Sequence, residues 1–226
     1  MPSDQAWLSS IWPTVRGFLP TPPAVVVELG CGSHGGFVPS VNHAGYAALG
    51  IDTAAPEGPG YQRAEFERSD LPRPLDAVVA CSSLHHVADP ARVLDRIAEH
   101  LVPGGIVVVV EWDWERFDEP TARWCFEHLG AASSDHGWLH PRRAGWLESG
   151  GRWEDYLHGW ASEHGLHKAT TILRELDRRF ERTHCSRGPY FFADLVDTAE
   201  QDELGAISAG QIQATRIDYI GRTGWR

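Results

Sequence analysis

The chain has 226 residues, of which 42% are hydrophobic, and it carries a formal net charge of −11. This length and composition predict an ordinary globular protein with one good core, organised as a single domain with an inserted cap. The negative charge argues against nucleic acid or an anionic membrane as the main partner, because both would repel the chain before any specific contact formed.

The sequence lacks recognisable membrane, export, disulfide and metal motifs. No apolar run approaches the roughly 20 residues that span a bilayer, and the amino terminus lacks a basic-then-apolar signal peptide. We therefore expect a cytoplasmic protein with no membrane partner. The cysteines lie far apart without a C-x-x-C pair, which indicates neither a zinc site nor a disulfide framework; they are Cys31, Cys81, Cys125 and Cys185.

The first predicted strand leads directly into a glycine-rich turn. Residues 25–36 read VVVELGCGSHGG, so an apolar strand containing Glu28 runs into a G-x-G-x-x-G pattern at Gly30, Gly32 and Gly35. A run of valines suits a strand buried on both faces, and glycines let the backbone approach a ligand closely. The pattern alone is weak evidence for a nucleotide site, because some chance loops carry it as well.

The segments that follow alternate between helix, strand and loop. We expect a helix over 37–43, a strand over 46–51 that ends at Asp52, a loop over 54–60, an extended stretch near 62–66 and a buried strand over 75–81. Asp89 and Pro90 then fit the N-cap and first turn of another helix. Pro103-Gly104-Gly105 ends that helix, and the β-branched run 106–110 predicts a central parallel strand.

This alternation predicts an α/β fold with a doubly wound, Rossmann-like sheet, in which ligands bind beyond the carboxyl ends of the strands. The sheet is mostly parallel with an antiparallel edge strand. Residues 117–188 read as a helical, tryptophan-rich cap inserted into this fold. Two late strands, over 190–193 and 211–220, flank a helix over about 198–209 and are expected to form an antiparallel pair at the sheet edge.

Several strand ends carry polar residues that resemble those of a known family. Strand one ends near Glu28, strand two at Asp52, and the fourth strand is followed by Leu84-His85-His86-Val87. Together with the Pro-Gly-Gly turn before strand five, these residues resemble the class I S-adenosylmethionine-dependent methyltransferases, in particular the small-molecule group with a Leu-His-His-Val-like segment. The resemblance covers about 24–112, with a weaker echo in 190–221.

The resemblance implies that S-adenosylmethionine is the cofactor and assigns its binding residues. Gly30 and Gly32 resemble the glycines that meet the methionine and ribose portions, Glu28 the acid that holds the amino group, and Asp52 the acid that accepts both ribose hydroxyls. The expected set also includes Cys31, Ser82, Glu65 and Phe66, the last two toward the adenine. Glu67 or Asp70 could serve in place of Glu65. The alternative without a ligand is a tight turn at the glycines and a solvated loop at the acids.

The resemblance also implies that residues 1–226 form a single methyltransferase domain. Within it we expect an N-terminal helical segment over 1–23, a cofactor-binding core over 24–116, the helical cap over 117–188 and the last strands over 189–226. A dinucleotide-binding protein would also place an acid at Asp52. The position of Glu28 and the Pro-Gly-Gly turn suit methyltransferases better, and a dehydrogenase would need a larger catalytic half.

His85 and His86 are the candidate bases, because a neutral imidazole can remove a proton from a hydroxyl or an amine near pH 7. They cannot both face one pocket if their segment is extended. In the family the second histidine often shapes the site instead. The remaining histidines fit no standard metal-ligand spacing, so no metal is expected. The expected acceptor pocket contains Glu111, Trp112, Asp113, Trp153 and Trp160, with a solvated loop and aromatic packing as the alternative.

The predicted function is transfer of a methyl group from S-adenosylmethionine to an oxygen or nitrogen of a small, aromatic or apolar molecule. Two alternatives stay open: a protein that binds S-adenosylmethionine without transferring its methyl group, and a peptide or protein methyltransferase. The partner expected is the small-molecule acceptor, with no nucleic acid and no membrane. The identity of the acceptor and the oligomeric state are left open by the sequence.

Overall fold

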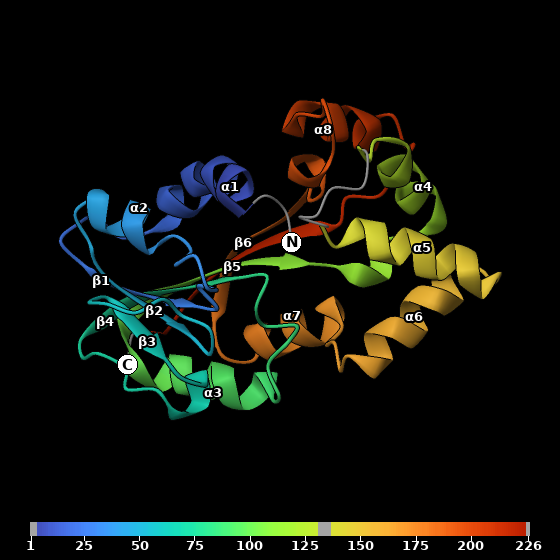
Figure 1. Cartoon of the computed structure of the whole chain (residues 1–226). Helices are drawn as coiled ribbons and strands as arrows, with labels where there is room; N and C mark the ends of the chain where they lie inside the picture. The colour runs from blue at the N-terminus through green and yellow to red at the C-terminus, as the bar shows by residue number, and fades with distance from the viewer. Residues whose placement is uncertain (1–3, 131–136, 225–226) are drawn as a thin grey trace.

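A single sheet with the strand order β3-β2-β1-β4-β5-β7-β6 organises the computed structural model, which describes residues 4–130 and 137–224 (Figure 1). Strands β1 to β5 run parallel, and β7 pairs antiparallel with both β5 and β6. The predicted doubly wound, mostly parallel sheet is confirmed. The strands are β1 (Val25–Leu29), β2 (Ala47–Asp52), β3 (Tyr61–Arg63), β4 (Leu75–Cys81), β5 (Leu101–Trp112), β6 (Glu181–Gly188) and β7 (Arg216–Arg222).

Helices cover both faces of this sheet, as its valine-rich strands require. Figure 1 shows α1 (Asp4–Phe18) and α2 (Val38–His43) on one face, and α3 (Pro90–His100) and α7 (Ala169–Asp177) on the other. The side chains of β5 alternate between two hydrophobic clusters, with Val108 buried toward α1 and Val107 toward α3. The sheet is therefore a two-sided core, and its carboxyl-terminal edge remains for a site.

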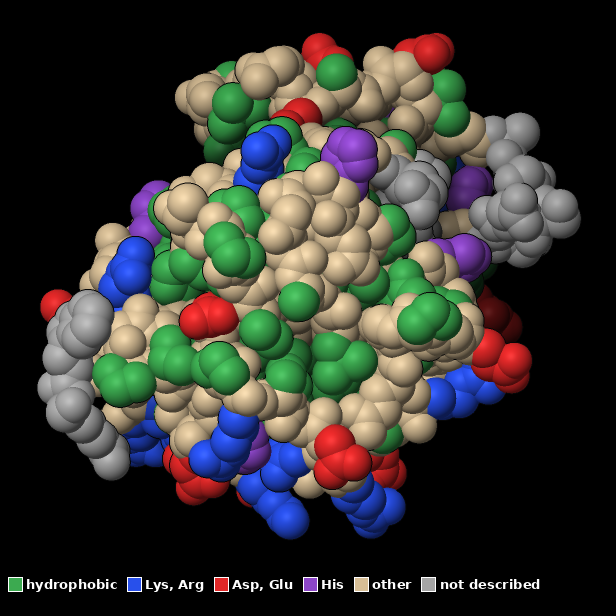
Figure 2. Space-filling view, turned by 90° about the vertical axis from the view of Figure 1, so that its left-hand side faces the viewer, with side chains coloured by type: hydrophobic (Ala, Val, Ile, Leu, Met, Phe, Trp, Pro, Cys, Tyr) green, Lys and Arg blue, Asp and Glu red, His purple; other side chains and the backbone are tan. Residues whose placement is uncertain are grey.

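The helix over 90–100 begins where the sequence predicts. The Asp89 carboxylate accepts hydrogen bonds from the backbone N–H groups of Ala91 and Arg92, and Pro90 occupies the first turn. Arg179, two residues after the end of α7, forms an ion pair of 2.7 Å with Asp95 of this helix. In Figure 2, basic and acidic side chains lie next to one another along the lower edge of the molecule, at the height of α3 in Figure 1.

The expected cap over 117–188 is too long. Helices α4 (Glu119–Glu127), α5 (Leu139–Ser149) and α6 (Trp153–Glu163) lie beyond the carboxyl end of β5 (Figure 1). By contrast, α7 packs on the sheet through Ile172 and Leu176, and residues 181–188 form edge strand β6. The sequence of β6, ERTHCSRG, is polar and mostly exposed, so it lacks the apolar alternation that identifies a half-buried strand.

The expected strand over 190–193 is wrong. These residues lead into a short 3₁₀ helix, η3 (Phe192–Asp194), and their backbone N–H groups bond to the Glu203 carboxylate of α8 (Glu200–Ser208) instead of to a neighbouring strand. The antiparallel pair expected at the sheet edge is β6 with β7, and β7 begins at Arg216 instead of residue 211.

Two further short helices lie near the ends of strands. The extended stretch expected near 62–66 is divided between β3 and the 3₁₀ helix η1 (Phe66–Arg68), while η2 (Trp114–Arg116) follows β5. Among the described residues, no helix is both long enough and apolar enough to cross a membrane.

Candidate active site

Three cavities meet at the carboxyl-terminal edge of the sheet, and Ser82, directly after β4, lines all of them. We call them the outer cleft, of about 470 Å³, the inner cavity, of about 270 Å³, and the aromatic pocket, of about 170 Å³. The outer cleft runs from Gly30 and Asp52 to Phe66 and Val87. The strand order reverses between β1 and β4, so this position is the topological switch point at which such sheets bind ligands.

The glycine turn after β1 forms the floor between the outer cleft and the inner cavity. Gly30 has a φ of +79°, and a Cβ there would collide with Ser83. Gly32 has a φ of +63°, and the space that its Cβ would fill is open. The backbone N–H of Gly32 donates to Asp52 Oδ2 at 3.0 Å, and Oδ1 accepts from Ala54 at 2.7 Å. Asp52 is thereby fixed beside the glycine turn, and each oxygen keeps a lone pair for a ligand.

Glu28 is a buried acid in the wall of the inner cavity. Its Oε2 accepts a hydrogen bond from the backbone N–H of Phe37 at 2.7 Å, but burial dominates and raises the pKa of the carboxyl to about 8. A Cβ on Gly36 would collide with this carboxylate. Gly36 therefore has a structural reason to be glycine, which the G-x-G-x-x-G pattern does not show.

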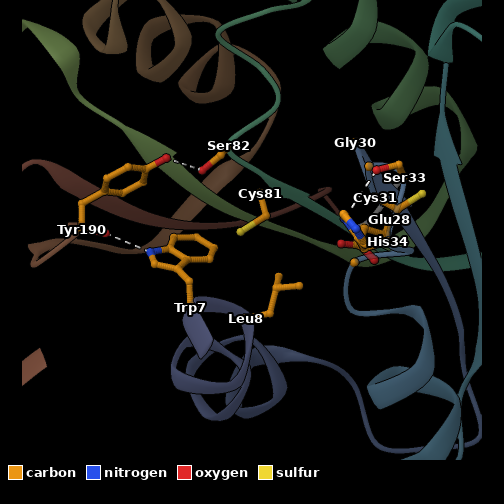
Figure 3. A pocket seen from close by; sticks show the side chains of 12 residues that line it. Trp7, Leu8, Glu28, Gly30, Cys31, Ser33, His34, Cys81, Ser82 and Tyr190 are labelled. Atoms are coloured by element: carbon orange, nitrogen blue, oxygen red, sulfur yellow. Dashed lines mark hydrogen bonds between the residues drawn. The ribbon is translucent and has the colours of Figure 1, made fainter. Parts of the chain in front are cut away.

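Helix α1 closes the inner cavity, a contribution that the sequence reasoning missed. Figure 3 shows Trp7 and Leu8 reaching from α1 toward Cys81 and Tyr190. The Trp7 indole N–H donates to the Tyr190 carbonyl at 3.0 Å, and the Tyr190 and Ser82 hydroxyls lie 2.9 Å apart. The apolar spacing Trp7, Ile11 and Val15 signals a packed helix, but does not reveal a cavity wall.

The other expected cofactor residues differ in their positions. Cys31 lines the inner cavity, and burial raises the pKa of its thiol to about 12. Phe66 is buried in the wall of the outer cleft, whereas Glu65, which also lines it, is exposed and pairs with Arg68 at 3.1 Å. Of the two acids considered in place of Glu65, Glu67 lines the cleft.

Glu111 holds the segment after β4 and orients His85. Its Oε1 accepts hydrogen bonds from the backbone N–H groups of Ser83 at 2.8 Å and Leu84 at 2.6 Å. Its Oε2 lies 2.5 Å from His85 Nδ1, and both side chains are almost completely buried. Glu111 was expected in the pocket lining. Side chains alternate along β5, so Trp112 lines the aromatic pocket while Glu111 acts behind it through His85.

His86 lies beside His85, with the two ring centroids 4.1 Å apart. Residues 84–86 form a turn, in which the His86 backbone N–H donates to the Ser83 carbonyl, and both histidines line the aromatic pocket. The condition that would keep them apart, an extended segment, is therefore not met. Desolvation in the cleft, followed by the charge of His85, lowers the pKa of the His86 ring to about 4, so this ring is neutral at pH 7.

Aromatic side chains form most of the wall of the third cavity. The rings of Trp112 and Trp138 pack edge to face with their centroids 4.9 Å apart, and those of Trp138 and Trp160 pack in the same way at 5.3 Å. The sequence did not predict four of the residues that line this pocket, namely Trp138, Tyr190, Phe191 and Asp194. The complete lining is Ser82, His85, His86, Trp112, Trp138, Trp160, Tyr190, Phe191 and Asp194.

Two residues expected in this lining lie elsewhere. Trp153 is completely buried within the cap, where its indole N–H donates to the Phe117 carbonyl at 2.5 Å. Asp113 is buried and forms an ion pair with Arg187 of β6. The first is therefore a core residue of the cap, and the second joins the end of β5 to the edge strand.

A comparison with protein families identifies the chain. A family described as a methyltransferase domain matches residues 9–184, which is more than half of the sequence. This protein belongs to the methyltransferase domain family. The predicted methyltransferase is confirmed, and S-adenosylmethionine-dependent methyltransferases of known structure share its fold. A comparison with curated protein sequences found no match.

Solved structures with the same fold include several methyltransferases. An S-adenosylmethionine-dependent methyltransferase from Mesorhizobium loti is 22% identical, with 95% of this chain and 99% of that chain covered and a TM-score of 0.55. The N-methyltransferase NodS from Bradyrhizobium japonicum, in complex with S-adenosyl-L-homocysteine, is 12% identical, with 95% and 86% covered and a TM-score of 0.52. Geranyl diphosphate C-methyltransferase from Streptomyces coelicolor is 14% identical, with 95% and 79% covered and a TM-score of 0.56.

Proposed function

We propose that this methyltransferase transfers a methyl group from S-adenosylmethionine to an oxygen or nitrogen of a small aromatic or apolar molecule. One observation carries the proposal: Ser82 lines the two cavities that suit the cofactor and also the aromatic pocket. A donor in the first two and an acceptor in the third would therefore be neighbours. Close approach of the two reactants is the main requirement of a displacement reaction.

The residues of the outer cleft and inner cavity fit the chemistry of the cofactor. The open space at Gly32 admits a ligand against the backbone, and Asp52 has acceptor capacity for a ribose diol. Glu28 is placed to meet an ammonium group in the inner cavity, and Phe66 offers an apolar surface to a base in the outer cleft. When bound, S-adenosylmethionine supplies the electrophilic methyl group.

The residues of the chain have two tasks in this reaction. Ser82, Tyr190 and the aromatic wall orient the acceptor and keep water from it. His85 is the better candidate for proton removal, since Glu111 fixes its ring. The His86 pKa of about 4 makes His86 a weaker base, and we assign it to shaping the pocket.

Two measurements test the proposal, one of cofactor binding and one of methyl transfer to an acceptor. Titration calorimetry with S-adenosylhomocysteine measures the cofactor site, and its release from S-adenosylmethionine in the presence of small phenols, amines and short peptides measures transfer. We expect release with small acceptors and none with peptides, because the aromatic pocket is small. Tight binding with no release in a metabolite extract would favour a binding module, and release with peptides alone would favour a protein methyltransferase.

A further inference from the structure

We infer that the acceptor is a phenol with a single aromatic ring, and that His85, oriented by Glu111, removes its hydroxyl proton. This inference rests on the proposed function and specifies its acceptor. The observations that carry it are the size of the aromatic pocket, the charged groups in and near its wall, and the contacts between the Glu111 and His85 side chains.

The size of the aromatic pocket suits an acceptor with one ring. Its volume is about 170 Å³, and an apolar cavity of about 150 Å³ in another protein is known to hold benzene. The indole rings of Trp112, Trp138 and Trp160 present faces and edges at the spacings at which aromatic rings pack. A planar ring fits such a wall better than a branched aliphatic molecule, and the volume is close to that of the cavity known to hold one ring.

The charges around the pocket favour a neutral acceptor. No lysine or arginine is among the described residues that line it, so a carboxylate or phosphate on the acceptor would have no counter-ion there. The guanidinium of Arg142 lies 4.8 Å from the centre of the Trp160 ring and 6.0 Å from that of Trp138. Arg142 does not line the pocket, but its charge near these two rings weakens their attraction for an ammonium group. The carboxyl of Asp194, which does line the pocket, acts in the opposite direction.

The contacts of Glu111 determine which nitrogen of His85 is available. Two backbone N–H groups donate to Glu111 Oε1, an arrangement that suits an ionised carboxylate, which can only accept hydrogen bonds. His85 Nδ1, 2.5 Å from Oε2, therefore carries the proton. His85 Nε2 then has a lone pair, and it makes no hydrogen bond within residues 4–130 and 137–224. A hydroxyl in the pocket is the natural partner for that lone pair.

The reaction balances without a further reagent. The Nε2 lone pair takes the phenolic proton, and an oxygen lone pair forms the new C–O bond as the bond from the methyl carbon to sulfur breaks. The electron pair of that bond stays on sulfur, which gives neutral S-adenosylhomocysteine. Glu111 stabilises the imidazolium until the proton passes to water. A phenol, with a pKa near 10, is within reach of an imidazole, whereas a neutral arylamine needs no base before attack.

Matched acceptors test the class of substrate. We expect kcat/KM for 4-methylphenol to exceed that for 4-methylaniline and for 2-naphthol by about 10-fold or more, a difference of about 1.4 kcal/mol. Preference for the aniline or the naphthol would overturn the inference. If S-adenosylhomocysteine binds but no phenol is methylated, this inference fails while the cofactor assignment stands. If S-adenosylhomocysteine does not bind, the proposed function itself fails.

Acidity of the phenol separates a base from a structural residue. His85→Asn should lower turnover of 4-methylphenol by about 100-fold or more, whereas 4-nitrophenol, already ionised at pH 8.5, should lose only a few-fold. Glu111→Gln should show the same dependence on acidity. His43→Asn, which changes an exposed histidine at the end of α2, is the matched control. Equal losses on both phenols in a folded His85→Asn variant would overturn the base role.

Discussion

The Glu203 carboxylate of α8 accepts a hydrogen bond of 2.8 Å from the backbone N–H of Tyr190. Its second oxygen accepts from Phe191 and Phe192, at 2.9 and 2.6 Å, and the side chain is completely buried. One acid therefore fixes the turn that presents Tyr190 and Phe191 to the aromatic pocket. Burial raises the pKa of this carboxyl to about 7, and the three N–H donors oppose the rise.

Replacing Glu203 by Gln should loosen this turn. The amide has one acceptor oxygen and an NH₂ group, so at least one of the three N–H groups loses its partner. We expect the free energy of unfolding to fall by about 1–3 kcal/mol, and KM for the acceptor to rise more than kcat falls. Urea titration and steady-state kinetics measure these effects. Glu163→Gln, the same change at an exposed position of α6, should have neither effect; unchanged stability in Glu203→Gln would refute the assignment.

Asp52 should contribute strongly to cofactor binding. Asp52→Ala removes the acceptor for the ribose hydroxyls and also the bond to the Gly32 N–H. We expect S-adenosylhomocysteine binding to weaken by about 1.5–3 kcal/mol, the range for hydrogen bonds to a charged group. Calorimetry on the folded variant measures this, with Glu57→Ala in the exposed loop after β2 as a control for the loss of one negative charge. Unchanged affinity would remove Asp52 from the site.

Much of the parallel half of the sheet was predictable because its local signals agree. Valine runs, Asp89 with Pro90 and the glycine turn each indicate the element that forms there. Strand β6 was missed because an edge strand needs no apolar alternation. Residues 190–193 were misassigned because their aromatic content is typical of a strand, while a carboxylate distant in sequence, Glu203, takes their N–H groups.

The site shows the same division between local and long-range information. Glu28, Gly32 and Asp52 lie at strand ends, where chain order and sheet topology place them, and they line the cleft or the inner cavity. The orientation of His85 depends on Glu111, 26 residues later. Trp7 reaches its cavity only through the packing of α1 on the sheet. Neither contact leaves a pattern that one sequence can reveal.

Two glycines of the turn should respond differently to alanine. A Cβ at Gly32 meets no protein atom within 4 Å but enters the space open to the ligand, whereas one at Gly36 collides with Glu28. Both positions have a φ above +50°, so both variants carry backbone strain. Gly36→Ala should lower the free energy of unfolding more than Gly32→Ala does. Gly32→Ala should weaken cofactor binding more than Gly36→Ala does, once the loss of stability of each variant is taken into account. Thermal unfolding and calorimetry on both variants test this, and the reverse order would contradict the geometry.

The acidity of Glu28 should make cofactor binding depend on pH. The folded-state pKa, about 8, exceeds the ordinary value of 4.5, so Glu28 is mostly protonated at pH 7 without ligand. An ammonium group in the inner cavity favours the carboxylate, and binding should therefore release a proton. S-adenosylhomocysteine affinity should rise between pH 6 and 8, by up to about 10-fold per pH unit. Calorimetry in buffers of different ionisation enthalpy counts the released proton.

Glu28→Gln separates this effect from stability. In the wild type, Glu28 binds its proton more strongly in the folded state than in the unfolded state, with a pKa of about 8 against 4.5. Its contribution to stability is therefore fully present below pH 4.5 and is lost as the pH rises through about 8. Glutamine does not titrate, so the variant should lose both the rise in cofactor affinity and part of the fall in stability over that range. Affinity that still rises with pH in Glu28→Gln would assign the released proton to another group.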